Sequence, residues 1–372
     1  MIAPRLLALP FRLKAVLRTE QHPVWLPDCY PVLNHVNSPL SSPRGREETM
    51  RVLLASPRGF CAGVNMAIET LEVALAHYGR PVYVYHEIVH NKWVVERFRQ
   101  KGAIFVDDLD QVPAGSNLLF SAHGVSPDVR RQAARGRLNA IDATCPLVMK
   151  VHREAVRFAG RGYTVVLIGH AGHDEVVGTM GEAPGAIVLV ERPEDVDRLD
   201  PPDPEKMAFL AQTTLSVDDA AQIIARLRHR FPKIVGPPRA DICYATQNRQ
   251  HAVRQLAAEA DMALVVGSPN SSNSLRLAEI ARARCGRAYL IDGPSEIDPH
   301  WFSGQETVLV TAGASAPEDV VQEVVGWLRR RFAAAVEARV VREEDVHFLL
   351  PRPIREVAAR YQGADRCQQG ER

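Results

Sequence analysis

From residue 50 onward, short apolar runs alternate with longer stretches in which apolar residues recur at helical spacing. Val52–Ala55 is an apolar run of the kind found in buried strands. Between Val64 and Tyr78, apolar residues recur at i, i+3, i+4 and i+7, which predicts an amphipathic helix. Cys61 therefore lies where a strand gives way to a helix N-terminus. Backbone N–H groups and the helix dipole at such a position favour an anionic thiolate.

The same arrangement of a cysteine before an amphipathic helix occurs twice more, at Cys145 and Cys243, which lie 84 and 98 residues after the preceding one. Each helix leads into a strand and a polar loop. These loops carry His90, His173 and Ser271, at 29, 28 and 28 residues from their cysteines. Each unit then ends in another strand and a turn into a helix. The repetition predicts three copies of one α/β unit, whose three equivalent cysteines should converge on one point.

The alternation of strands and helices predicts an α/β fold with mainly parallel sheets, arranged as three pseudo-equivalent lobes around a central site. After the first strand, we predict strands at Val82–Tyr85, Ala103–Val106, Leu118–Phe120, Val165–Ile168, Ile187–Val190, Phe209–Leu210, Leu264–Val266 and Thr307–Val310. Ligands of parallel sheets bind at the carboxyl ends of the strands. Because every polar loop follows a strand, we expect the loops to share one site.

Local composition divides the chain into six segments. Residues 1–49 are rich in proline and lack periodic apolar positions, so we expect a disordered extension; a targeting peptide is the weaker alternative. The remaining segments are a strand segment at 50–62 that should pack with the third lobe, the lobes at 63–145, 146–242 and 243–332, and a charge-rich C-terminal tail at 333–372. In that tail we expect a strand at Val346–Leu350 and a frayed end.

Bulk composition narrows the class of protein. Apolar residues make up 46% of the 372 positions and charged residues 24%, which is ordinary for a globular protein. The net charge of +1 gives no reason to expect nucleic-acid or membrane-surface binding. No apolar run approaches transmembrane length. Six cysteines are too sparse for a secreted disulfide scaffold, so we expect a cytoplasmic protein whose spaced cysteines serve metal binding or catalysis.

Three thiolates that converge at helix starts suit a soft metal centre. The candidates are a zinc ion with three cysteines and one open position, or an iron–sulfur cluster with one iron left free to act as a Lewis acid. The absence of any C-x-x-C pair argues against a structural zinc site. The alternative is that the cysteines are small buried hydrophobes. We favour that alternative for Cys29, Cys285 and Cys367, which have no counterparts in the other units.

The polar loops suit an anionic ligand. Hydroxyls, imidazoles and helix N-terminal N–H groups together are typical of phosphate or diphosphate sites. The candidate binding residues are His90, His123, His173, Ser271, Ser272, Asn273 and Ser315. No Walker A or G-x-G-x-x-G motif indicates a nucleotide. The alternatives are plain N-capping for Ser271 to Asn273 and a capping box between Ser315 and Glu318.

Glu175 is a carboxylate two residues from a candidate phosphate-binding histidine. Near a metal cluster and a bound anion its pKa should rise, which suits a general acid. Thr213 could then carry a proton between Glu175 and the substrate. The alternative is a solvated acid in a loop.

The motifs around these residues resemble one enzyme family along most of the chain. They read PRGFCAGV, HEIVHN, FSAHGVS, DATCPLV, IGHAGHDEVVGTMGE, AQTTLSVDD, DICYATQNRQ, GSPNSSNSLRL and VTAGASAPE. In order and spacing, the segment from Met50 to about Val324 is similar to the LytB family, the 4-hydroxy-3-methylbut-2-enyl diphosphate reductases. The lead of 49 residues is not typical of that family.

The resemblance implies a 4Fe–4S enzyme with its cluster at the centre of the three lobes, at the last step of the methylerythritol phosphate route to isoprenoids. Such an enzyme removes the substrate's hydroxyl as water, using two electrons and two protons, and yields isopentenyl and dimethylallyl diphosphate. By motif position, Cys61, Cys145 and Cys243 would hold the cluster, and the residues of the polar loops would bind the diphosphate. Glu175 and Thr213 would deliver protons, and His123 would also contact the reacting end.

The chain shows no flavin or nicotinamide motif, so the resemblance also implies an external electron donor, a ferredoxin or a flavodoxin. We expect a monomer. Two rivals stay open on the residues alone. One is a zinc hydrolase that acts on a phosphate ester, and the other is a diphosphate sensor without catalytic activity.

Overall fold

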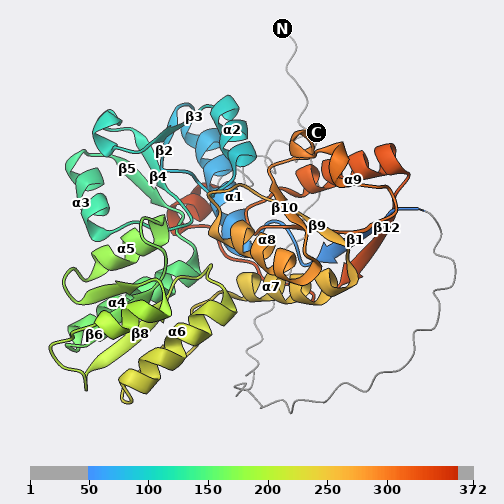
Figure 1. Cartoon of the computed structure of the whole chain (residues 1–372). Coiled ribbons are helices and arrows are strands. Elements are labelled where there is room, and N and C mark those ends of the chain that lie inside the picture. The colour runs from blue at the N-terminus through green and yellow to red at the C-terminus, as the bar shows by residue number, and fades with distance from the viewer. Residues whose placement is uncertain (1–48, 359–372) are drawn as a thin grey trace, which may run out of the picture. The chain divides into compact units, whose positions relative to one another are not determined.

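The computed structural model describes residues 49–358. The segment predicted to be a disordered extension lies outside this range except for its last residue, and so do Cys29 and Cys367. The described chain contains three separate sheets flanked by helices (Figure 1). Every pair of neighbouring strands in these sheets is parallel. The α/β class with parallel sheets is therefore confirmed.

The first lobe contains a four-stranded sheet. Its strands, in spatial order, are β3 (Ala103–Val106), β2 (Val82–Tyr85), β4 (Asn117–Phe120) and β5 (Asn139–Asp142). Its helices are α1 (Ala62–Tyr78), α2 (Lys92–Lys101) and α3 (Pro127–Arg135). The apolar stripe of α1 packs against β2, so Ala67, Leu71 and Ala74 are completely buried beside Val82 and Val84.

The second lobe contains a three-stranded sheet with α4 and α5 against one another and α6 beside β8. Its strands, in spatial order, are β7 (Ile187–Val190), β6 (Thr164–Ile168) and β8 (Met207–Ala211). Its helices are α4 (Pro146–Gly160), α5 (Asp174–Glu182) and α6 (Val217–Arg230).

The third lobe contains a five-stranded sheet. Its strands, in spatial order, are β10 (Ala288–Ile291), β9 (Met262–Val266), β11 (Thr307–Ala312), β1 (Arg51–Ser56) and β12 (Ala335–Val340). Its helices are α7 (Tyr244–Leu256), α8 (Ser272–Cys285) and α9 (Glu318–Phe332). Short 3-10 helices lie at Leu109–Gln111, Pro193–Arg198, Ala257–Glu259, Pro294–Glu296 and Pro299–Trp301. Within the described residues, no helix is both long enough and apolar enough to cross a membrane.

The strand before Cys61 is an inner strand of the third lobe. β1 pairs with β11 on one side and with β12 on the other, so that Arg51 lies opposite both Thr307 and Ala335. A strand covered on both faces needs apolar side chains at successive positions rather than alternate ones. The run Val52–Ala55 meets this requirement, and all four of its residues are buried.

The strand predicted in the C-terminal tail was wrong, and the predicted frayed end lies outside the described residues. Val346–Leu350 has no regular secondary structure, and the strand of this region is β12 instead. β12 lies at the edge of its sheet, where Glu337 is exposed and Arg339 is half-buried, so its sequence shows no apolar run. Beyond β12 the chain returns to the first lobe, and completely buried Ile354 belongs to the core of that lobe.

Candidate active site

Each of the three cysteines is the N-cap of a helix that the repeat predicted. Cys61 precedes α1, Cys145 precedes α4 and Cys243 precedes α7. Their backbone N–H groups donate to equivalent loop carbonyls, from Cys61 to Ala314 at 3.2 Å, from Cys145 to Ala122 at 3.0 Å and from Cys243 to Thr213 at 3.1 Å. These hydrogen bonds join the start of each helix to the loop that follows a strand. The three units therefore present their cysteines in the same way.

The cysteine side chains face one cavity, and the first turn of α1 comes very close to them. A Cβ atom built on Gly63 would lie 2.6 Å from Cys145 Sγ and 3.9 Å from Cys61 Sγ. Cys243 Sγ lines the same cavity and accepts the N–H of Thr246 at 3.4 Å. All three thiols are free. Glycine at position 63 is thus required by the close approach of the thiols.

Burial disfavours the ionised form of the Cys145 and Cys243 thiols. Burial and then the charge of Cys61 raise the pKa of Cys145 well above the ordinary range of a thiol, although the N–H groups of Leu147 and Val148 act to lower it. Burial and Cys61 likewise raise the pKa of Cys243 to about 11. The N–H groups at the helix N-termini lower the thiol pKa values, as predicted, but burial raises them by more. Three such thiols ionise together only around a cation, so the donor set fits a metal centre.

The spacing of the sulfur atoms discriminates between metal centres. Among the described residues, the group whose ligand atoms all lie within 4.8 Å of one another is His90, His123 and Asp174, and the three cysteines do not form such a group. A single zinc ion holds each sulfur at about 2.3 Å and so needs closely spaced thiolates. The wider spacing of the cysteines fits a cluster of several metal atoms better than a single ion.

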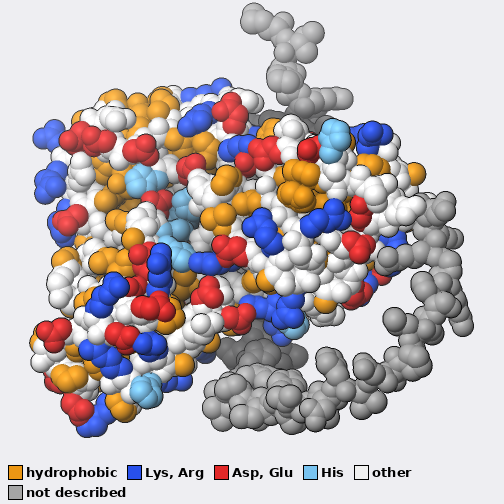
Figure 2. All heavy atoms as spheres, in the orientation of Figure 1, with side chains coloured by type: hydrophobic (Ala, Val, Ile, Leu, Met, Phe, Trp, Pro, Cys, Tyr) orange, Lys and Arg blue, Asp and Glu red, His pale blue; other side chains and the backbone are white. Residues whose placement is uncertain are grey.

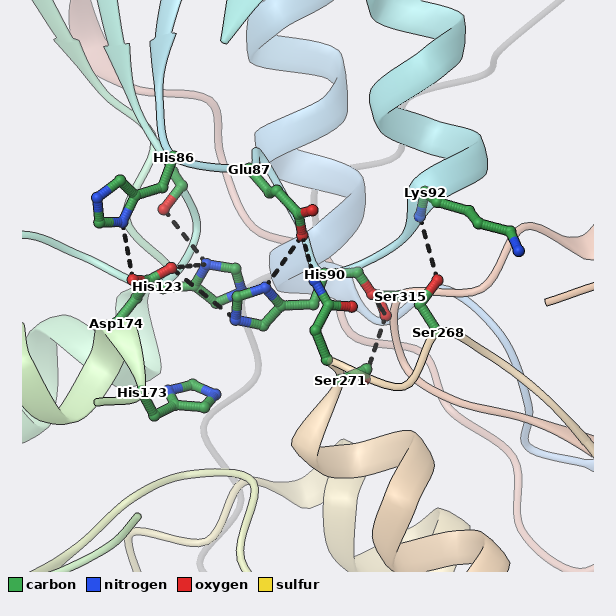
Figure 3. A network of polar contacts seen from close by, with 12 residues as sticks. His86, Glu87, His90, Lys92, His123, His173, Asp174, Ser268, Ser271 and Ser315 are labelled. Carbon is green, nitrogen blue, oxygen red and sulfur yellow. Dashed lines mark hydrogen bonds and ion pairs between the residues drawn. The ribbon is translucent and has the colours of Figure 1, made fainter. Parts of the chain in front are cut away.

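Three imidazoles gather on the side of the cavity formed by the first and second lobes (Figure 3). His90 follows β2 and His123 follows β4, and their rings stack at 3.9 Å with an angle of 14° between planes. His173, from the second lobe, meets the His90 ring edge-on at 5.2 Å. Figure 2 shows histidine side chains at the surface where the lobes meet. The carboxyl ends of strands in two lobes therefore supply one group of ring nitrogens.

The local hydrogen bonds of His173 define which of its nitrogens faces the cavity. His173 is the N-cap of α5, and its Nδ1 accepts the backbone N–H of Glu175 at 3.2 Å. Burial, followed by the charge of His90, lowers the pKa of His173 to about 4. The ring is therefore neutral near pH 7, and Nε2 carries its proton. His173 can donate a hydrogen bond to an anion without being charged.

The third lobe contributes hydroxyls and an amide. Ser271 is the N-cap of α8, as the alternative interpretation of this residue proposed. Ser272 Oγ donates to the Thr214 carbonyl at 3.4 Å. The Oδ1 atom of Asn273 accepts the Ala314 N–H at 2.9 Å, whereas its buried Nδ2 has no hydrogen-bond partner. A buried donor without an acceptor is costly, so Asn273 Nδ2 points to a ligand with oxygen atoms.

Ser315 has no capping role. The proposed capping box with Glu318 does not form, because the N-cap of α9 is Pro317 and Glu318 instead binds Arg58. Ser315 Oγ donates to the His90 carbonyl at 2.8 Å and lies 3.5 Å from Ser271 Oγ. This hydroxyl therefore joins the third lobe to the imidazoles.

Glu175 lies in the first turn of α5, and 2% of its surface is exposed, so it is not a solvated acid in a loop. Its carboxylate accepts the Thr213 N–H at 2.7 Å and the Thr213 hydroxyl at 2.8 Å. Burial raises the pKa of Glu175 to about 7, even though both hydrogen bonds from Thr213 act to lower it. Around neutral pH this carboxyl exists in both protonation states, as a general acid requires.

All twelve site residues predicted from the sequence line a single cavity. They are Cys61, His90, His123, Cys145, His173, Glu175, Thr213, Cys243, Ser271, Ser272, Asn273 and Ser315. Sequence reasoning missed Phe348, which reaches the same cavity from the C-terminal segment. The apolar run at 346–350 was the available signal, but it suggested a strand. Cys285 donates its S–H to the Ala281 carbonyl at 3.1 Å and takes no part in the site.

A family model described as LytB protein matches residues 52–329. The chain belongs to the LytB family. The family resemblance drawn from the motifs is thus confirmed. One LytB relative, the 4-hydroxy-3-methylbut-2-enyl diphosphate reductase of Rhodopirellula baltica, is 61% identical over 310 residues, which cover 83% of this chain and 97% of that protein. The reductase of the same name from Streptomyces coelicolor is 55% identical over 306 residues, which cover 82% of this chain and 90% of that protein.

Solved structures of LytB relatives agree with this assignment. The E-1-hydroxy-2-methyl-but-2-enyl-4-diphosphate reductase from Plasmodium falciparum matches with a TM-score of 0.81 and 39% identity, over 84% of this chain and 99% of that chain. A structure of (E)-4-hydroxy-3-methyl-but-2-enyl diphosphate reductase, described as the terminal enzyme of the non-mevalonate pathway, matches with a TM-score of 0.55 and 30% identity, over 76% and 99% of the two chains.

Proposed function

We propose that this protein reduces 4-hydroxy-3-methylbut-2-enyl diphosphate to isopentenyl and dimethylallyl diphosphate, the last step of the methylerythritol phosphate pathway. The relatives that carry this reductase name support the proposal. The observation that carries it is the composition of one cavity, where three free thiols lie with donors suited to an anion, including the unpaired Asn273 Nδ2. Two electrons and two protons break the carbon–oxygen bond, form a carbon–hydrogen bond and release water.

We propose that Cys61, Cys145 and Cys243 hold a 4Fe–4S cluster. Their burial, their equivalent attachment to three helices and their wide spacing support this cofactor over a single zinc ion. When bound, the cluster supplies the electrons and an iron with an open position that acts as a Lewis acid toward the substrate's hydroxyl. The chain positions each thiol on a separate lobe, so holding the cofactor also ties the three lobes together.

The diphosphate is assigned to the polar loops. His90, His123 and His173 offer ring nitrogens from the first two lobes, and the third lobe offers the hydroxyls of Ser271, Ser272 and Ser315. Asn273 Nδ2 supplies a donor that has no partner within the protein. Many of these groups are neutral, so they bind the anion through directed hydrogen bonds as well as charge. His123 is also assigned to the reacting end of the substrate.

Glu175 is assigned as the proton donor, with Thr213 as its relay. The carboxyl is buried and its pKa of about 7 keeps it partly protonated at neutral pH. The Thr213 hydroxyl contacts one oxygen of the carboxylate and lines the cavity, so it can accept a proton from Glu175 and donate its own toward the substrate. An external ferredoxin or flavodoxin, in the cytoplasm, completes the proposal as the electron donor to a monomeric enzyme.

The test is an anaerobic assay of the purified protein with the diphosphate alcohol and reduced viologen. The expected result is turnover to both products by a brown protein that contains about four iron and four sulfide per chain. Stoichiometric zinc in a colourless, active protein would instead support the phosphate-ester hydrolase. Substrate binding without any turnover by the brown protein would leave only the diphosphate sensor.

A further inference from the structure

Asp174 lies at the junction of two lobes, between the site residues His173 and Glu175. It is the first residue of α5 in the second lobe, and its carboxylate faces the first lobe (Figure 3). Oδ1 is 2.8 Å from His86 Nδ1, and Oδ2 is 3.7 Å from His123 Nδ1 and 4.0 Å from His90 Nε2. One carboxylate therefore faces three imidazoles that come from two loops of the neighbouring lobe.

The backbone conformation of His86 indicates that its contact with Asp174 helps to hold the loop in place. Its φ angle is +57°, in the left-handed region that side chains other than glycine seldom adopt. Such a conformation is unfavourable and persists only where the surroundings hold it. The side chain of His86 is held by its hydrogen bond to Asp174 and its stacking on Tyr85 at 4.0 Å, and its backbone N–H donates to the Val106 carbonyl at 2.9 Å. The loop that carries His90 therefore begins from a backbone position fixed by Asp174.

The ring arrangement argues against a metal ion at His90, His123 and Asp174. The two rings are stacked nearly parallel at 3.9 Å. A ring nitrogen binds a metal along its lone pair, which lies in the plane of the ring. Two parallel rings stacked face to face do not direct their lone pairs to a common point. The arrangement is better explained by charge, since an anion beside stacked imidazoles stabilises a proton on them.

The charges around the rings support this explanation. The hydrogen bond to Asp174 is the main influence that raises the pKa of His86, and it outweighs burial. Burial and then His90 lower the pKa of His123 well below its ordinary value, and Asp174 opposes them. Burial acts to raise the pKa of Asp174, but its hydrogen bond to His86 and the charge of His123 prevail and lower it to about 2. Asp174 is therefore an anion throughout the physiological range.

We propose that Asp174 is a positioning residue for the diphosphate, because its carboxylate orients His86, His90 and His123 and pairs with His86 at 2.8 Å, which holds a positive charge beside the two stacked rings. A positively charged group attracts the diphosphate, whereas three neutral rings would offer hydrogen bonds alone. This inference rests on the proposed function. The other charged or titratable groups that face these rings are Glu87, Asp107, His173 and, beside His86, Tyr85.

The test measures the binding of inorganic diphosphate to the anaerobically purified, cluster-containing protein by titration calorimetry between pH 6 and pH 8. In Asp174→Asn the side chain keeps its size but loses its charge. At pH 6 the His86 imidazole holds a proton more readily even without its partner, so the variant should bind within about twofold of the wild type. At pH 8 it should bind about tenfold more weakly, because the ion pair that retains the proton is gone. Asp174→Ser, which also suits a helix start, should give the same dependence on pH.

Asp107→Asn is the matched control. It removes the same charge from a residue that acts on His86 only at a distance, so its affinity should follow the wild type within about twofold at every pH. A loss of affinity in Asp174→Asn that is equal at all pH values, or no loss at all, overturns the proposal. Failure of the wild type to bind inorganic diphosphate overturns it together with the assigned diphosphate site. Normal binding with no turnover of the diphosphate alcohol refutes the proposed reduction and leaves the role of Asp174 standing.

Discussion

Replacing Glu175 with glutamine removes the ionisable proton of the side chain and keeps its size and shape. In the wild type, Thr213 donates its N–H and its hydroxyl to the two carboxylate oxygens, at 2.7 and 2.8 Å. A glutamine of the same size keeps one oxygen for the Thr213 N–H. Its amide nitrogen can donate to the Thr213 hydroxyl, which can reverse its role because hydroxyls both donate and accept. We therefore expect Glu175→Gln to fold and to bind the diphosphate with nearly unchanged affinity.

The expected loss of turnover rate in this variant follows from the pKa of the wild-type carboxyl. With a pKa of about 7, half of the Glu175 side chains carry a proton at pH 7. At an ordinary pKa of 4.5 the fraction would be below about one in a hundred. Proton transfer from a positioned acid contributes about 10²–10⁴-fold to the rate. The variant should therefore lose that factor in kcat, while KM changes by less than about threefold.

The pH dependence gives an independent check. A general acid works while protonated, so kcat/KM of the wild type should fall as pH rises through about 7, and Glu175→Gln should lack this fall. The free energy of unfolding should also fall as pH rises, over a lower pH range. Because the folded pKa exceeds the ordinary value of 4.5, the wild type loses about 3 kcal/mol of unfolding free energy as pH rises from 4.5 to about 7. The variant avoids that loss.

The assay is anaerobic turnover with reduced viologen across pH 6 to 9, together with urea unfolding across about pH 4.5 to 8. Glu194→Gln is the matched control, since it makes the same change at an exposed glutamate of the second lobe. A Glu175→Gln enzyme that retains wild-type kcat, or that keeps the alkaline fall in kcat/KM, would refute the role of Glu175 as acid.

Three further changes test the cysteine site and its surroundings. Gly63→Ala should lose most of its bound iron, measured by iron analysis, because the new Cβ would meet Cys145 Sγ at 2.6 Å. Arg249→Met should lower the unfolding free energy by about 3 kcal/mol in urea titrations, because it leaves the half-buried carboxylate of Glu344 without its cation and the Gly59 carbonyl without its donors. Phe348→Ala should retain iron in anaerobic preparations but lose it several-fold faster in air, since this ring covers part of the cavity.

Gly160→Ala is the control for Gly63→Ala. It adds the same methyl group where nothing lies within 4 Å, so its iron content should equal that of the wild type. Full iron content in Gly63→Ala would contradict the close approach of α1 to the thiols. An Arg249→Met protein as stable as the wild type would show that the buried ion pair is dispensable. Equal rates of iron loss in air for Phe348→Ala and the wild type would show that the ring shields nothing.

The inner strands and the polar loops could be predicted from the sequence because their signals are local. The run Val82–Tyr85 folds as the predicted strand with the same bounds, and each cysteine starts its predicted helix. The motif spacing also placed the site residues, because equivalent positions of repeated α/β units meet at the carboxyl ends of their strands. The edge strands β3 and β7 were also predicted, but two other edge strands gave no such signal: β12 exposes charged side chains, and β5 has only Ile141 as a buried residue.

Contacts between residues far apart in the sequence could not be predicted from local sequence patterns. Phe348 and Ile354 are apolar residues in a charged tail, and nothing local shows that one lines the cavity while the other enters the core of the first lobe. Asp174 was overlooked for a similar reason, since its three imidazole neighbours come from another lobe. The net effect of burial on the cysteine pKa values also required the structure, because a helix start and a buried cavity act on a thiol in opposite directions.

The position of β1 constrains the order in which the molecule can be made. Arg51 finds its two neighbours, Thr307 and Ala335, only after the ribosome has made all three lobes. The sheets of the first and second lobes are built from contiguous stretches and can form as they leave the ribosome. The earliest strand must meanwhile stay unpaired until the last one emerges, which makes its docking a slow, long-range step. Because Cys61 follows that strand closely, the three cysteines can be brought together only after the last strand of the third lobe has been made.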